Sequence, residues 1–170
     1  MGRLSTKENK NEFQICREAI GYSREKASEV MEWVSPERIE KIESEKSAPH
    51  PDEVLAMSVA YKVPRLCNHY CAKLCPIGQE YVPEVKVKDL SQIVLEMLAS
   101  LNSIQKKQMR LIEITADGEI SGDEIEDFVH IQSELERISI TVETLQLWSE
   151  RMLATGVIDM EAYQAYKRKK

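Results

Sequence analysis

Three cysteines near the middle of the chain form its densest group of reactive side chains. Cys67, Cys71 and Cys75 recur at steps of four in "CNHYCAKLC". On a continuous helix these steps place all three thiols on one stripe, where neighbouring thiolates can reach one soft metal such as zinc. Structural zinc sites usually gather ligands from two separate segments, and a fourth ligand is missing here. We therefore favour no metal site and expect no cofactor. Packing residues or a redox-responsive thiol group remain as interpretations.

A second group of polar side chains lies in "VSPERIEKIESEKSAPHP", residues 34–51. A serine followed by a proline opens this stretch, as at the start of many helices, and glutamates then alternate with arginine and lysine. Arginine and lysine side chains donate to phosphates and to guanine, whereas a glutamate accepts from cytosine N4. The stretch could therefore contact nucleic acid, although its acidic side chains would also face the phosphates.

Catalytic chemistry has little support in the sequence. The three histidines, His50, His69 and His130, lie in different predicted elements. We find no serine-centred elbow, no glycine-rich phosphate loop and no His-Glu-x-x-His motif. We therefore do not expect an enzyme.

The composition predicts a folded, all-α protein. Apolar residues make up 42% of the 170 residues and charged residues 31%, with only 6 Gly and 6 Pro, a mixture that favours helices over turn-rich sheet. The net charge of −6 argues against a broadly basic surface wrapped on nucleic acid. No apolar run approaches the roughly 20 residues of a membrane span, and the N-terminus has no apolar signal core. We expect a cytoplasmic protein with no membrane contact.

Helix-starting and helix-ending residues in the first part of the chain predict five short helices. Gly21 ends the first, and Ser23 and Ser35 are the expected N-caps of the second and third. Pro76 and Gly78 are expected to stop the fifth helix. The stretch "QEYVPEVKV" that follows lacks a helical period and is predicted to be extended.

The second part of the chain has a longer apolar period. Its first long helix carries a heptad seam, broken once by a glutamine, at Leu90, Val94, Met97, Leu101, Ile104, Gln108 and Leu111. A second helix of about 30 residues follows, and at 1.5 Å per residue it is expected to be about 45 Å long. Asp159 is expected to cap a short terminal helix. The predicted domains are a helical domain at 1–78, a linker at 79–88, and a helical dimerisation domain at 89–170, built as a long antiparallel hairpin plus the short terminal helix.

The five-helix part resembles the phage-repressor (Cro/repressor, or XRE) type of helix-turn-helix domain over roughly residues 10–75. The resemblance rests on three stretches: "CREAIGYSREKAS", "VSPERIEKIESEKSAP" and "LAMSVAYKVP". It implies a structural ion pair between Arg17 and Glu43, with Ser28 as the small residue inside the second helix. It also implies a bacterial, cytoplasmic regulator of transcription. No family is recognised in the C-terminal half.

The resemblance further implies double-stranded DNA as the partner, with the third helix offering its outer residues to the major groove. The candidate DNA-binding residues, the first of them at a phosphate, are Arg24, Pro36, Glu37, Arg38, Glu40, Lys41 and Lys46. We therefore predict a sequence-specific DNA-binding transcriptional regulator.

Three departures from the family pattern bear on this prediction. Arg24 stands where the family usually has Gln, Glu32 stands at the glycine of the family's turn, and the spacing from Ser23 to Ile39 is one residue longer than usual. The glutamates of the third helix also offset most of the attraction that its basic residues exert on phosphates. Two alternatives stay open: a protein-interaction adaptor that retains the scaffold without binding DNA, and a metal- or redox-sensing switch that uses Cys67, Cys71 and Cys75.

The long helices predict a homodimer through residues 89–155. Two long amphipathic helices and a short third one cannot bury both sides of their apolar stripes in an isolated hairpin, whereas two copies paired into a bundle of four long helices can. Two linked half-site contacts would also strengthen a weak DNA reader through effective concentration. The alternative is that the hairpin packs on the first domain of its own chain.

Overall fold

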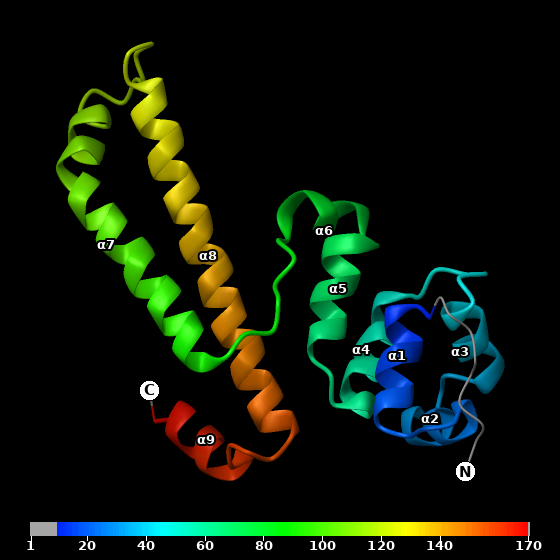
Figure 1. The fold of residues 1–170 in the computed structure, drawn as a ribbon. Helices are drawn as coiled ribbons and strands as arrows, with labels where there is room; N and C mark the ends of the chain where they lie inside the picture. The colour runs from blue at the N-terminus through cyan, green and yellow to red at the C-terminus, as the bar shows by residue number, and fades with distance from the viewer. Residues whose placement is uncertain (1–9, 170) are drawn as a thin grey trace. The chain divides into compact units, whose positions relative to one another are not determined.

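The computed structural model describes residues 10–169, which form nine helices and no strand (Figure 1). The predicted all-α fold is therefore confirmed. The chain divides into two compact units: one holds the residues up to Glu84 and those from Glu150 onward, and the other holds Val85–Ser149. Across residues 10–169, no helix combines the length and the hydropathy needed to cross a lipid bilayer.

The first unit contains six helices before Glu84 and one after Glu150. They are α1 (Glu12–Ala19), α2 (Arg24–Met31), α3 (Pro36–Glu43), α4 (Pro51–Tyr61), α5 (Arg65–Lys73), α6 (Pro76–Tyr81) and α9 (Met160–Lys167). The predicted caps are confirmed, because the side chains of Ser23, Ser35 and Asp159 each accept a hydrogen bond from the backbone N–H three residues further on.

A single apolar core joins helices α1 to α5. Its most deeply buried side chains, all 2% exposed or less, are Ala27, Val34, Ile39, Ile42, Val54, Met57, Tyr61 and Leu66. Within α3 and α4 these residues recur at steps of three and four, so each of these two helices turns one face inward. The core thereby fixes α3 between α1 and α2 and leaves its opposite face to solvent.

The end of this unit differs from the sequence prediction. Residues 79–81 were expected to be extended, but they belong to α6, so a short sixth helix follows the five predicted ones and the extended segment begins after it. Pro76 occupies the first turn of α6, where its missing N–H costs nothing, so it starts a helix. Gly78 lets α6 lie directly against α5, since a Cβ at this position would be 2.1 Å from the carbonyl oxygen of Cys71.

The non-helical segment therefore runs from Val82 to Asp89. Its first residues are held on α5: the Asn68 side chain donates to the Pro83 carbonyl at 2.9 Å, and Lys73 lies 2.7 Å from the Glu84 carboxylate. The segment is thus anchored up to Glu84.

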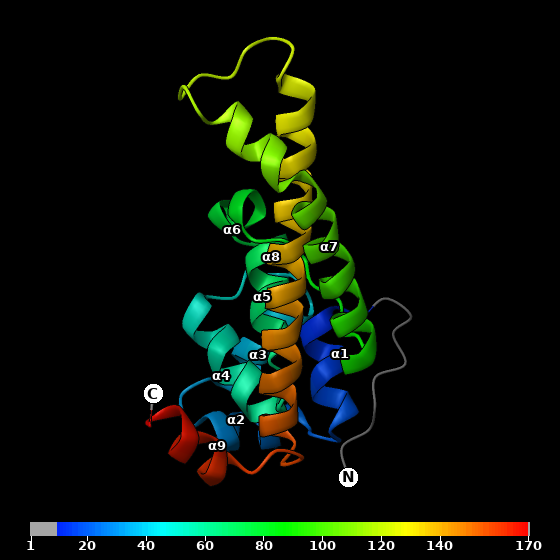
Figure 2. The ribbon, with the colours of Figure 1, turned by 90° about the vertical axis from the view of Figure 1, so that its left-hand side faces the viewer.

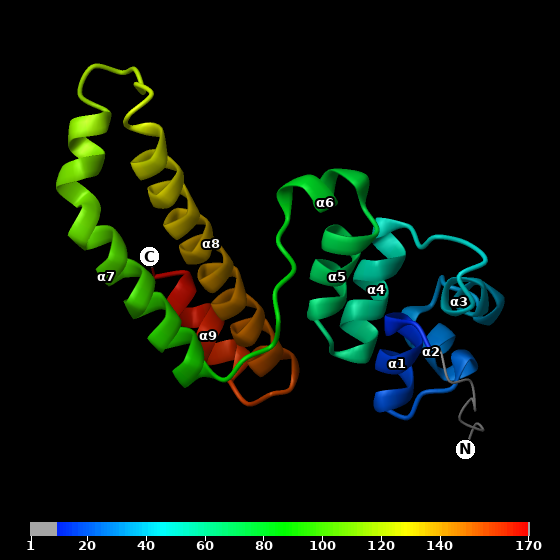
Figure 3. The ribbon, with the colours of Figure 1, turned by 45° about the horizontal axis from the view of Figure 1, so that its top comes forward.

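The second unit is an antiparallel hairpin of α7 (Leu90–Ile114) and α8 (Ile125–Ala154), with α8 continuing past Ser149 (Figures 2 and 3). The loop between them ends in a capping interaction, because the Ser121 backbone N–H donates to the Glu124 carboxylate at 3.0 Å. The predicted long hairpin and short terminal helix are confirmed.

The two long helices face each other through a mixed set of side chains. Those that line the space between them are Ile104, Lys107, Leu111, Ile131 and Glu134. The predicted heptad seam is only partly turned inward: Ile93 and Ser100 are buried, whereas Val94 and Leu101, one residue later in each case, are 41% and 47% exposed. The apolar stripe of α7 is therefore broader than the hairpin can cover.

The close contact at Gly78 gives a stability prediction. Gly78→Ala is expected to destabilise the first unit by about 1–3 kcal/mol, because the new methyl group must push α6 off the α5 backbone. Chemical denaturation followed by circular dichroism measures the loss. Gly122→Ala is the matched control, since a Cβ there meets no atom within 4 Å. An unchanged midpoint for the Gly78 variant would contradict the close packing of α5 and α6.

Candidate nucleic-acid interface

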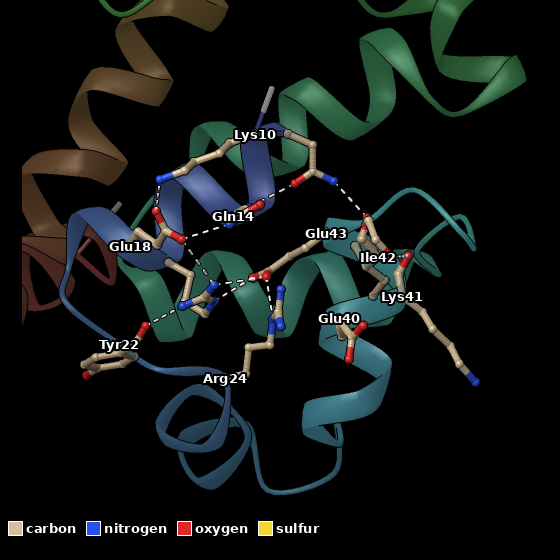
Figure 4. Close-up of polar contacts among 12 residues, drawn as sticks. Lys10, Gln14, Glu18, Tyr22, Arg24, Glu40, Lys41, Ile42 and Glu43 are labelled. Atoms are coloured by element: carbon tan, nitrogen blue, oxygen red, sulfur yellow. Dashed lines mark hydrogen bonds and ion pairs between the residues drawn. The ribbon is translucent and has the colours of Figure 1, made fainter. Parts of the chain in front are cut away.

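The position of α3 is fixed by an ion pair that reaches it from α1. Arg17 donates from Nε to Oε1 of Glu43 at 2.5 Å and from Nη2 to Oε2 at 3.0 Å, and both residues are about 95% buried (Figure 4). Arg17 also donates to the Tyr22 carbonyl at 2.5 Å. One guanidinium thus holds the last turn of α3 and the chain segment before α2 in one geometry.

The same carboxylate has a second partner in α2. Nε of Arg24 donates to Oε2 of Glu43 at 2.8 Å, and the Arg24 side chain is 34% exposed. The Nη groups of Arg24 have no hydrogen bond to the described residues, so they remain available to a ligand. Two guanidiniums share one carboxylate here, which leaves positive charge at the N-terminus of α2. The family resemblance predicts the Arg17–Glu43 pair but gives no signal for the Arg24 contact.

A third link joins α1 to the end of α3. The Asn11 side chain accepts from the Gln14 backbone N–H at 3.0 Å, capping α1, and donates to the Ile42 carbonyl at 2.8 Å. It thereby adds a side-chain donor to the Ile42 carbonyl, which also accepts from the Glu45 backbone N–H at 3.1 Å. With Glu43 it fixes the C-terminal turn of α3 from two sides.

Arg38, a candidate for DNA contact, is used inside the domain. Its guanidinium donates to Glu53 at 2.6 and 2.7 Å, to the Ser47 hydroxyl at 2.6 Å and to the Ala48 carbonyl at 2.9 Å. These bonds occupy all but one of its N–H groups. Arg38 thus ties α3 and the following loop to the first turn of α4. The sequence signal for Glu53, a glutamate three residues after the helix-opening His50, was not recognised.

Other candidates form the solvent face of α3. Glu37, Glu40 and Lys41 are exposed, and Figure 4 shows Lys41 extending away from the ion-pair network. Hydrogen bonds from its own backbone N–H and from Ser35 lower the pKa of Glu37, so its negative charge is retained at neutral pH. Lys46 lies 3.9 Å from the Glu40 carboxylate. The face therefore carries both signs of charge.

Pro36 has a structural place at the start of this face. It occupies the first turn of α3 and is partly exposed. Because Ser35 accepts from the Arg38 backbone N–H at 3.2 Å, the N-terminal turn of α3 is well ordered and its outer side is open to a partner.

The turn between α2 and α3 is made without the family's glycine. Glu32 has φ 66° and ψ −41°, and the Trp33 backbone N–H donates to the Met31 carbonyl at 2.8 Å, which makes a γ-turn. This conformation is costly for a residue with a side chain. The helix-turn-helix geometry is thus kept at Glu32 at the expense of backbone strain.

The cysteines do not form a metal site in the structure. Cys67, Cys71 and Cys75 are free, partly exposed thiols. Within residues 10–169, no group of three or more His, Cys, Asp or Glu side chains is arranged to hold a metal ion. Burial and the neighbouring Cys75 and Cys67 raise the pKa of Cys71, which leaves less of the reactive thiolate at neutral pH.

The comparison with known families addresses this same part of the chain. Residues 14–66 match the family model described as Helix-turn-helix. They form a helix-turn-helix domain of the XRE type. The match supports a DNA-binding transcription regulator, and the family is one of DNA-binding regulators and not of enzymes. No curated protein and no solved structure gives a significant match to the chain.

The Arg38–Glu53 contact predicts how the stability of the helix-turn-helix domain depends on pH. Hydrogen bonds from Arg38 lower the pKa of Glu53 from its ordinary value of 4.5, despite the opposing effect of burial. The unfolded chain therefore binds this proton more readily, so the stabilisation is fully present above about pH 4.5 and is lost as the pH falls through the folded-state pKa. Glu53→Gln is expected to cost about 1–3 kcal/mol at pH 7 and progressively less below pH 4. Urea unfolding across this pH range measures the difference.

The control for this prediction is the same substitution in an Arg38→Gln background. There the carboxylate has lost its main partner, so the pH-dependent difference between Glu53 and Gln should largely vanish. A difference that persists unchanged in that background would assign the effect to another neighbour.

The strained turn gives a prediction of opposite sign. Glu32→Gly is expected to raise the stability of the helix-turn-helix domain by about 0.5–1.5 kcal/mol, because glycine adopts a positive φ without a Cβ clash. Glu29→Gly, in the interior of α2, is the matched control and should lower stability by about 1 kcal/mol. Thermal unfolding of both variants decides; equal losses would mean that the turn is unstrained.

Proposed function

We propose that this chain is a cytoplasmic, sequence-specific transcriptional regulator that binds double-stranded DNA as a homodimer. The observation that carries the proposal is α3 of the matched helix-turn-helix domain, which Glu43 and Asn11 hold at its C-terminal turn while its outer face stays exposed. A fixed helix with an open polar face is what insertion into a major groove requires.

Arg24 is proposed to bind a phosphate. Glu43 orients its guanidinium through Nε and leaves both Nη groups free, next to the N–H groups at the start of α2. A helix N-terminus and a guanidinium both favour an anion. Because Glu43 is also the last residue of α3, the phosphate contact and the reading helix share one anchor. Arg38 is instead proposed to position the loop that carries Lys46.

Base contacts are proposed for the outer residues of α3. Lys41 can donate to guanine O6 and N7, while Glu37 and Glu40 can accept from cytosine N4, and Pro36 lies beside them at the start of the helix. Each carboxylate near the DNA also repels phosphates. A specific contact between that carboxylate and a base of the preferred DNA sequence must therefore offset this repulsion. The expected result is weak binding by one domain and strong dependence on the base pairs at these positions.

Homodimerisation through residues 89–155 would offset this weak binding. Two half-sites about one helical turn apart would be held together by one protein, which raises the local concentration of the second reader. The exposed apolar side chains of α7 and α8 support this role for the C-terminal helices.

A second candidate function is a protein-interaction adaptor that keeps the helix-turn-helix scaffold. The observation in its favour is the acidic surface of α2, α3 and the turns that follow them, where six glutamates are exposed: Glu25, Glu29, Glu32, Glu37, Glu40 and Glu45. Such a surface would suit a basic protein partner. A redox switch at Cys67, Cys71 and Cys75 has less support, because the raised pKa of Cys71 disfavours the reactive form.

A binding selection against random DNA duplexes, repeated over a range of salt concentrations, separates these functions. Recovery of one enriched sequence at moderate salt supports the regulator, and no recovery even at low salt supports the adaptor. Replacing the three cysteines by serine tests the redox switch, because a switch would lose its response to oxidant while DNA binding remained.

The mixed charge of α3 gives a testable prediction for the enriched duplex. Lys41→Gln is expected to weaken binding about 10-fold and to reduce the salt dependence by about one counterion. Glu40→Gln is expected to strengthen non-specific binding a few-fold at low salt and to relax the preference at one base pair. Fluorescence anisotropy at several salt concentrations measures both.

Glu119→Gln is the control for Glu40→Gln, since it makes the same change of charge on an exposed residue of the α7–α8 loop. It should leave base preference unchanged. If Glu40→Gln and Glu119→Gln behave alike, α3 does not face the DNA.

A further inference from the structure

The outer side of α7 carries an apolar stripe without charge along its whole length. At 100° per residue, the charged residues Glu96, Lys106, Lys107, Arg110 and Glu113 all fall within one third of its circumference. A separate stripe is made by Leu90, Val94, Leu98, Leu101 and Ile112, which are between 39% and 54% exposed. A solvent-exposed helix face would normally carry charge, so this stripe calls for a partner.

α8 has a matching stripe. Leu135 and Val142 are 50% and 42% exposed, and the residues between and beyond them on this side, Ser139 and Gln146, are uncharged. Each exposed apolar residue directly follows a buried one: Leu135 follows Glu134 and Val142 follows Thr141. The stripe is therefore turned, in the same chain sense, by roughly 100° from Glu134 and Thr141 and by about 40° from the buried Ile131.

The two stripes lie on the same side of the hairpin. On α7, Val94 and Leu101 directly follow the buried Ile93 and Ser100, so this stripe is turned in the same sense along the chain as that of α8. Because α7 and α8 run antiparallel (Figure 1), a turn in the same chain sense brings both stripes to one side of the hairpin. We call this surface, formed by Leu90, Val94, Leu98, Leu101, Ile112, Leu135 and Val142, the uncharged face.

The buried side of the hairpin is unusually polar by comparison. Ser100, Glu134, Thr141 and Thr144 are each 8% exposed or less. The two threonine hydroxyls bond back to their own helix, to the Arg137 and Ile140 carbonyls at 2.8 and 2.6 Å. The hairpin thus buries these polar groups beside Ile93, Ile114, Ile131 and Leu147, and leaves leucines and valines exposed on the uncharged face. That exposed apolar surface remains available for an interaction outside the hairpin.

We propose that the uncharged face is the homodimer interface, against which the same face of a second copy packs about a two-fold axis. This inference rests on the homodimer of the proposed function and assigns its surface. The stripe of α7 is about 37 Å long at 1.5 Å per residue, and the uncharged side of α8 from Phe128 to Gln146 is about 27 Å long. At about 10 Å of width per helix, the two offer roughly 600 Å² per copy. That lies at the lower end of the approximately 600–1,000 Å² per partner of stable protein interfaces. A second copy is the occupant because a face without charge on either helix matches itself without placing like charges opposite each other.

The test is the oligomeric state of full-length variants, measured by sedimentation at micromolar concentration. The wild type is expected to be a dimer. Leu101→Glu and Val142→Glu should each raise the dissociation constant at least about 100-fold, because a two-fold interface would bury two unpaired carboxylates. Leu95→Glu is the matched control: Leu95 is 67% exposed on α7 but lies on the flank that carries Lys106 and Glu113, so the dimer should persist.

Gln105→Glu is a second variant, used in case Leu101→Glu unfolds the protein. It places a charge on the same side of α7, at a residue that is already polar and exposed. It should also weaken the dimer while helicity by circular dichroism stays unchanged. A monomeric wild type, a dimer that persists in Leu101→Glu and Val142→Glu, or equal dissociation of Leu95→Glu would overturn the assignment. The DNA selection on the wild type is independent of this result. Sequence-specific recovery of DNA by a protein that dimerises elsewhere refutes only the assignment of the interface. Dimerisation through the uncharged face without recovery of DNA refutes only the proposal of a transcriptional regulator.

Discussion

The position of α3 in the helix-turn-helix domain depends on one buried carboxylate. Glu43 accepts two hydrogen bonds from Arg17 and one from Arg24, and thereby joins α1, α2 and α3 at a single point. Loss of Glu43 would leave the buried Arg17 guanidinium without its main counter-charge, which costs far more than the intact network contributes. These ion pairs therefore confine α3 to one orientation. That orientation determines which side chains of α3 are exposed on its outer face.

Local rules were sufficient for most of the fold. Ser23 and Ser35 could be recognised as caps because capping depends on a few adjacent residues, and the long helices could be recognised from their apolar period. The prediction for residues 76–81 was wrong because Pro76 and Gly78 are usually helix breakers. Here Pro76 starts α6, and Gly78 permits the contact of α6 with Cys71, which is a non-local effect. No local sequence pattern predicts a close approach between two helix backbones.

The candidate site was less predictable than the fold, because side-chain partners are chosen in three dimensions. Spacing marked Arg38 as a basic residue on α3, but Glu53 and Ser47, which occupy its guanidinium, come from later in the chain. Arg24 was recognised as a phosphate ligand candidate, whereas its contact with Glu43 required the packing of α2 on α3. Counting basic residues therefore overstates the charge that α3 can offer to DNA. Lys41 keeps its charge free of any ion pair within residues 10–169.

The anchoring of Pro83 and Glu84 on α5 shortens the connection from the helix-turn-helix part of the chain to α7. Only Val85–Asp89 separates Glu84 from the first residue of α7, and an extended chain covers about 3.3–3.6 Å per residue. In the proposed dimer, this short connection limits how far each helix-turn-helix domain can lie from the start of α7. Operators of such a dimer are expected to have a narrow range of half-site separations, because a larger separation would require Pro83 and Glu84 to leave α5.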